Sequence, residues 1–177
     1  LPEIDVFSID LDTHIRSHSR EDIQNFVAIA KRLTEDLFVA ACGNETESKR
    51  LLATYIDPLP DSKTIYKLRL FAVTRCPSFF IPEIKDLLFR VFNAGERYSE
   101  IEGGAEYHQG LIAGFGILSQ SDKDQYVSEL IKYFGENLRD TDKERWRKRD
   151  ALKILSYIKQ HLTEQQIAEA ESVYGKI

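Results

Sequence analysis

The chain has 177 residues, which is the size of one domain or of a short run of repeats. A composition of 42% apolar and 30% charged residues excludes general disorder, and the longest apolar runs are far shorter than the roughly 20 residues that a membrane span requires. The net charge of −5 disfavours nucleic acid as the default partner, because attraction to phosphates grows with the number of basic contacts.

The N-terminal segment differs from the rest of the chain. Residues 4–6 and 9–12 alternate apolar and acidic side chains, as an extended chain does, and no second strand signal follows to pair with them. We therefore expect residues 1–18 to form an extended acidic arm or linker, and residues 19–177 to form one helical domain. The chain has no methionine, even at position 1, so we expect a processed product or part of a larger protein.

Helix start and stop signals recur from Ser19 to the end of the chain. Capping residues precede each apolar periodic segment, Pro82 stands in a first turn, and Thr163 with Gln166 forms a capping box before the last helix. In the first helix, Leu33 and Leu37 follow the apolar spacing. The expected helices span residues 19–43, 46–58, 61–76, 82–95, 105–119, 121–134, 141–162 and 163 onward. This pattern predicts an all-α protein.

The helices repeat at about 40 residues. A shift of 43 places the apolar positions of residues 84–91 on those of residues 127–134, and a shift of 40 places those of 111–118 on those of 151–158. Two consecutive helices that match at nearly one period indicate a true repeat, which buries its apolar face only by stacking on its neighbours. Gly110, Gly114 and Gly116 lie inside one predicted helix, where they allow close helix approach. We expect an α-solenoid of about four antiparallel helix pairs.

One of these helix pairs resembles a known repeat. Residues 140–152 consist of an acidic turn, then Trp146-x-x-Arg149, then small and apolar residues, and this segment resembles the start of the second helix in HEAT repeats of the HEAT and armadillo-like superfamily. The resemblance covers about residues 46–162. The preceding pair departs from it, because Tyr107 and Gly110 stand where the tryptophan and arginine are expected. The resemblance implies a binding protein whose second helices line a concave surface, while a minority of HEAT-like proteins are DNA alkylpurine glycosylases.

The best candidate binding site lies on the helix of residues 141–162. At 100° per residue, Trp146, Arg149, Lys153 and Tyr157 fall opposite the apolar side, and residues 143–160 carry seven bases and two acids. Such a basic and aromatic stripe suits an acidic peptide or phosphates. The alternative is a solvated helix face with the tryptophan packed against a neighbouring repeat.

The remaining chemistry-bearing residues give weaker signals. Cys42 and Cys76 lie beside apolar residues, and with no signal peptide in view we expect two reduced thiols in an intracellular protein, cytoplasmic or nuclear. His14 and His18 are four residues apart without further ligands, which favours exposed histidines over a metal site. The acids around Gly103, which are Glu100, Glu102 and Glu106, have no fixed catalytic geometry. We therefore expect no catalytic residues, no metal and no cofactor.

These observations predict a non-enzymatic protein-interaction module that binds a protein or peptide on its concave helical face. Trp146, Arg149, Lys153 and Tyr157 are the expected partner-binding residues. One alternative is a nucleic-acid-binding domain of the glycosylase type that acts through residues 143–160, which would need an acid facing the stripe. Another is a structural segment of a larger multidomain protein. No membrane partner is expected.

Overall fold

The computed structural model describes residues 21–60, 63–93, 105–135 and 141–177, and among them the side chains of residues 28–60, 64–92, 106–133 and 148–177. These residues form eight α-helices and no strand, so the prediction of an all-α protein is confirmed. The predicted arm at residues 1–18 and the loop around Gly103 lie outside the described residues. The helices are α1 (Glu21–Ala41), α2 (Glu45–Leu51), α3 (Lys63–Val73), α4 (Ile81–Asn93), α6 (Ala105–Gly114), α7 (Gln120–Gly135), α8 (Thr141–Ile158) and α9 (Glu164–Tyr174).

Local signals set several helix boundaries. Asn44 caps α2 by accepting a hydrogen bond from the backbone N–H of Glu47, and α2 continues into a π-helical turn, η3 (Leu52–Ile56), before the prolines. Short 3-10 turns precede α4 at Pro77–Phe79 (η4), extend α6 at Phe115–Ile117 (η6) and extend α8 at Lys159–His161 (η7). The predicted capping box of Thr163 and Gln166 is present at α9. Composition and spacing therefore fix most boundaries to within one or two residues.

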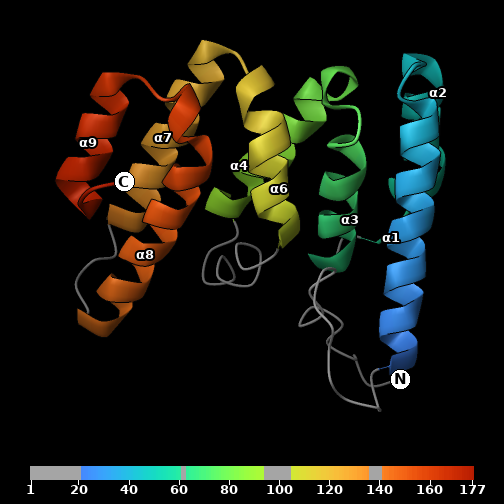
Figure 1. Ribbon diagram of the computed structural model, residues 1–177, viewed down its shortest axis with the longest axis horizontal. Coiled ribbons are helices and arrows are strands. Elements are labelled where there is room, and N and C mark those ends of the chain that lie inside the picture. Colours follow the sequence, from blue (N-terminus) through green and yellow to red (C-terminus); the bar gives the residue numbers. More distant parts are fainter. Residues whose placement is uncertain (1–20, 61–62, 94–104, 136–140) are drawn as a thin grey trace.

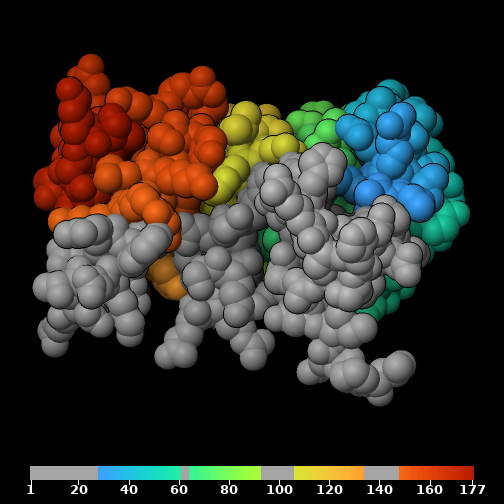
Figure 2. Space-filling view, turned by 60° about the horizontal axis from the view of Figure 1, so that its bottom comes forward, coloured from blue at the N-terminus to red at the C-terminus, as the bar shows by residue number. Residues whose placement is uncertain are grey.

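The helices form two rows. Along the chain they alternate between a first row of α1, α3, α6 and α8, in which each contacts the next, and a second row of α4, α7 and α9, with α2 beside η4. Figure 1 shows the helices following one another along the long axis from the blue N-terminal end to the red C-terminal end. The same order of colours runs across the space-filling surface in Figure 2. Each helix thus packs mainly against helices that are close to it in the sequence.

Helices whose apolar positions match under the sequence shifts are neighbours within a row. Helices α4 and α7, related by the shift of 43, lie side by side, and so do α6 and α8, related by the shift of 40. Leu111 and Phe115 of α6 and η6 are fully buried, as are their counterparts Ala151 and Leu155 of α8. Ile112 breaks the match because it is 53% exposed.

Glycines bring α6 close to its neighbours. A Cβ on Gly110 would lie 2.8 Å from a side-chain atom of Leu70 in α3, and one on Gly114 would lie 2.5 Å from Cγ2 of Ile84 in α4. Both distances are shorter than real Cβ contacts allow, so these helices approach as they do only because the side chains are absent. The expectation of close helix packing at these glycines is confirmed.

Buried tyrosine hydroxyls, among them those of Tyr66, Tyr107 and Tyr174, donate to backbone carbonyl oxygens in the core. Tyr66 of α3 donates to the carbonyl oxygen of Leu87 at 2.8 Å, and Tyr174 of α9 donates to that of Ile131 at 2.8 Å. Burial raises the pKa of both phenols well above the usual value, and for Tyr66 the nearby Tyr126 adds to this effect. The fold therefore favours the neutral form of both side chains.

We expect stability to fall as the pH rises above about 10, where unfolded tyrosine ionises. Because the folded-state pKa of Tyr66 is raised, its contribution is fully present below that pH and is lost as the pH increases toward the folded-state pKa. Urea unfolding from about pH 8 to about pH 11 measures this slope. Tyr66→Phe should cost about 1 kcal/mol at neutral pH and make the alkaline slope shallower, whereas an unchanged slope would contradict the assignment.

A disulfide joins Cys42, just after α1, to Cys76, at the start of η4. The Cα atoms are 5.3 Å apart, within the ordinary range for a disulfide. The prediction of two reduced thiols is therefore wrong, because residues 34 positions apart come together when α1 packs on α3. Disulfides persist mainly in oxidising compartments, so reduced thiols no longer support an intracellular location, and the compartment stays a prediction.

The first helix also departs from its predicted apolar face. Leu33 and Leu37, expected to follow the core spacing, are 57% and 47% exposed, whereas Phe38 is buried. Among the described helices, α1 stands at the end of its row and packs against α2 and α3, which leave part of its apolar surface uncovered. No helix in the described ranges is long and apolar enough to cross a membrane.

Candidate functional site

The predicted stripe on α8 is partly visible as an exposed basic face. Arg149 and Lys153 are exposed, and the side chain of Arg149 is 63% accessible while it contacts Asp150 at 3.4 Å. The opposite face of the helix is buried through Ala151, Ile154, Leu155 and Ile158. The helical periodicity therefore separated the core from the exposed side correctly at these positions, and the binding role of the two cations stays a prediction.

Tyr157, one turn beyond Lys153, is less open than the two cations. It is half-buried, and its ring stacks on His108 of α6 with centroids 4.7 Å apart and planes at 27°. The stack ties α8 to α6, so one face of the ring is covered, and the binding role of Tyr157 stays a prediction. Trp146 lies in α8, but its side chain is outside those that the structure describes. Of the four predicted residues, the structure places Arg149 and Lys153 together on open surface.

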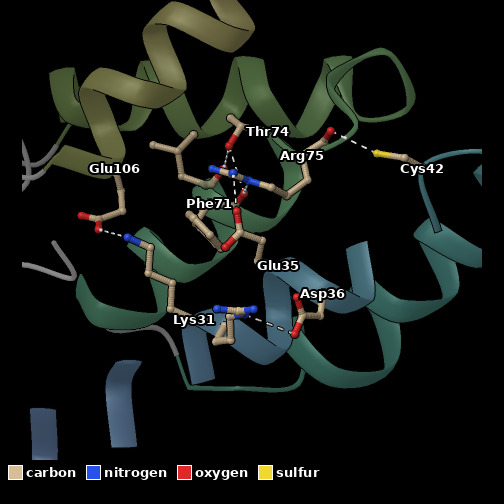
Figure 3. Close-up of polar contacts among 10 residues, drawn as sticks. Lys31, Glu35, Asp36, Cys42, Phe71, Thr74, Arg75 and Glu106 are labelled. Carbon is tan, nitrogen blue, oxygen red and sulfur yellow. Dashed lines mark hydrogen bonds and ion pairs between the residues drawn. The ribbon is translucent and has the colours of Figure 1, made fainter. Parts of the chain in front are cut away.

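The structure also reveals a polar cluster between α1, α3 and α6, shown in Figure 3. Phe71 of α3 is 3% exposed and lies between two cations: Arg75 is 4.1 Å from the ring centroid and Lys31 of α1 is 5.1 Å from it. Arg75 also pairs with Glu35 of α1 at 3.2 Å. The cluster covers an aromatic ring that would otherwise meet solvent, and it binds α1 to α3.

Glu106 completes the link to the third helix of the row. Its carboxylate is buried in the first turn of α6 and lies 3.9 Å from Nζ of Lys31 (Figure 3). Sequence reasoning grouped Glu106 with the acids around Gly103, at the start of the helix predicted from residue 105; the structure places it in the first turn of α6, facing α1. Glu100 and Glu102 lie outside the described residues. At this position Glu106 can anchor a lysine between helices.

The pairings in this cluster join residues 40 and 75 positions apart, so local spacing did not reveal them. The one available signal was that Phe71 and Arg75 stand four apart on a helix, which favours a stacked pair. Among the described residues no group of histidine, cysteine or acidic side chains is arranged to hold a metal ion. The candidate pair His14 and His18 lies outside them.

The comparisons with known proteins add no assignment. A scan against protein-family models, a search of curated proteins and a search of solved structures each found no match to this chain.

Proposed function

We propose that the chain is a HEAT-type α-solenoid that acts as a protein-interaction module. The alternation of helices between two rows, with each helix beside its repeat counterpart, supports this proposal. A stacked helix-pair architecture gives a rigid, extended surface and supplies partner-binding residues from successive helices. The role is binding rather than catalysis, and HEAT-like proteins of the scaffold kind are the class that it resembles.

The observation that carries the proposal is the exposed pair Arg149 and Lys153, one turn apart on α8. The pair projects from a helix whose other side is fully packed, so the two charges have a fixed spacing. Carboxylates of an acidic peptide or protein segment would meet them with little reorganisation, and electrostatic attraction would speed the encounter. Trp146, on the same α8 helix, and Tyr157, held against α6, are proposed as neighbouring contacts.

The glycosylase alternative requires an acid that faces the basic stripe. The buried acid of α6, Glu106, lies toward Lys31 of α1, and α8 packs on α6 from the other direction along the row. Glu106 therefore does not supply such an acid. The net charge of −5 favours protein binding over nucleic-acid binding.

The test reverses the two charges. Arg149→Glu/Lys153→Glu should weaken an acidic partner at least about tenfold, since each lost charge contact contributes on the order of 1 kcal/mol. The matched control is Lys132→Glu/Lys176→Glu, which changes the net charge equally at exposed positions on α7 and near the C-terminus. Both variants should keep the wild-type circular dichroism spectrum and melting temperature.

Affinity capture from a cell lysate, with mass spectrometry of the retained proteins, measures the effect. We expect a protein that is retained by the wild type and the control and is lost by the α8 variant. Equal retention by all three would refute the role of these residues. Recovery of nucleic acid that moderate salt releases would instead favour the nucleic-acid alternative.

A further inference from the structure

The outer face of α1 carries an apolar stripe. Ile29, Leu33 and Leu37 are spaced four residues apart and are 58%, 57% and 47% exposed. This spacing places them on one side of the helix, and that side is opposite to buried Phe38. Neighbouring exposed apolar side chains on one helix face form a continuous apolar surface, and such surfaces are where proteins make contacts.

The stripe continues into a groove between α1 and the segment formed by α2 and η3. The groove has a volume of about 300 Å³ and is lined by Leu37, Ala40, Leu51 and Tyr55 together with the paired Glu47 and Arg50. Tyr55 itself is 56% exposed. The apolar surface therefore has both a ridge and a depression, which is the shape that another helix can fit.

The two ends of the rows differ in polarity. At the far end, the exposed positions of α9 include Glu164, Gln165, Glu169 and Ser172. Terminal elements of a stacked-helix protein need such polar outer faces to stay soluble. The described part of α9 meets this requirement, whereas the described part of α1 exposes Ile29, Leu33 and Leu37, so this part of α1 has the character of an interface.

The charges beside the stripe indicate which partner fits it. Arg32 and Asp36 flank the stripe on one side, pair with each other at 3.4 Å and are 77% and 62% exposed. Arg32 and Asp36 are each two residues from Thr34 along the helix. Consider two α1 helices packed antiparallel, with the two-fold axis at the level of Thr34. The charged side of one copy then lies next to the same side of the other, and Arg32 of each copy lies opposite Asp36 of its partner.

The apolar residues fit the same register. In that arrangement Leu37 of one copy lies between Ile29 and Leu33 of the other, so the side chains alternate along the seam. We propose that α1 is the interface of a homodimer of this geometry. The surface is self-complementary under the two-fold axis. A second copy therefore provides apolar residues opposite the stripe and, in the same register, a charge of opposite sign across from Arg32 and from Asp36.

The first test is the association state. Sedimentation equilibrium of the full chain should show a monomer–dimer equilibrium in the micromolar range, and Leu33→Glu should weaken it at least about tenfold. Because Leu33 is exposed, this variant should keep the melting temperature that the wild type shows at concentrations well below the dissociation constant of the dimer. Ile112→Glu is the matched control, since Ile112 is similarly exposed but belongs to α6 and not to the stripe on α1, and it should dimerise as the wild type does.

The second test is charge exchange. R32D alone and D36R alone each place like charges across the two-fold axis and should both be mostly monomeric. Mixed in equal amounts, they should form a heterodimer, because each charge then meets its opposite. A wild-type monomer at all concentrations up to about a hundred times the expected dissociation constant would overturn the proposal. So would a Leu33→Glu variant that dimerises normally, or a mixture that does not recover association.

Discussion

Removing the Cys42–Cys76 disulfide should lower the free energy of unfolding by about 3 to 4 kcal/mol. The bond joins residues 34 positions apart in the sequence. A loop of this length reduces the entropy of the unfolded chain enough to stabilise the folded state by about 3 to 4 kcal/mol. Each sulfur also lies close to a backbone carbonyl oxygen. Sγ of Cys42 is 3.1 Å from the carbonyl oxygen of Arg75, and Sγ of Cys76 is 3.3 Å from the carbonyl oxygen of Phe38. Reduced thiols can therefore donate to these oxygens, and the loss is mainly entropic.

The loss of stability on removing the disulfide should be confined to the first helix pair, α1 and α2. Helix α1 is at the end of its row, and without the disulfide it is held by noncovalent contacts, which include the Glu35–Arg75 ion pair, Lys31 over the ring of Phe71 and the rings of Phe38 and Phe80. Hydrogen exchange with and without a reductant should show faster exchange in α1 and α2 and little change in α7 to α9. A Cys42→Ala/Cys76→Ala variant should exchange like the reduced wild type and should not respond to reductant. Equal melting temperatures of the oxidised and reduced protein would contradict the prediction.

Replacing Gly114 by valine should destabilise the protein by several kcal/mol, and replacing it by alanine by about 1 to 3 kcal/mol. The added Cβ would lie 2.5 Å from Cγ2 of Ile84, a methyl group attached directly to the Cβ of a residue that is fully buried in α4. Alanine gains about 1 kcal/mol of helix propensity over glycine, but the steric conflict outweighs this gain. Urea unfolding followed by circular dichroism at 222 nm gives the difference.

Gly43 supplies the control for this experiment. A Cβ there would have no atom within 4 Å, so Gly43→Ala should change stability by less than about 0.5 kcal/mol. If Gly114→Ala were as stable as the wild type, the close packing of α6 on α4 would not depend on the missing side chain.

The helices could be predicted from the sequence because their signals are local. The capping box of Thr163 and Gln166 and the first-turn position of Pro82 depend on residues three or four apart, and both are confirmed. The apolar face of α1 was predicted less well, because periodicity shows which residues share a side but not whether another helix covers it. Leu33 and Leu37 share a side that no described helix covers.

The candidate site divides in the same way. Exposure of Arg149 and Lys153 follows from the position of the buried residues on their own helix. The stack of Tyr157 on His108 joins residues 49 positions apart, and the Cys42–Cys76 bond joins residues 34 apart. Such contacts depend on how helices pack, and a single sequence without a matching relative carries no signal for them.

The alternating path of the helices also bears on the speed of folding. Because each helix packs against those near it in the chain, the fold has few distant contacts, and proteins of this kind fold in microseconds to milliseconds. Oxidation of thiols takes seconds to hours. The helices therefore assemble before the disulfide forms, and the bond links two cysteines that helix packing has already brought together. A chain made without an oxidant reaches the same arrangement and lacks only the bond that fixes its first pair.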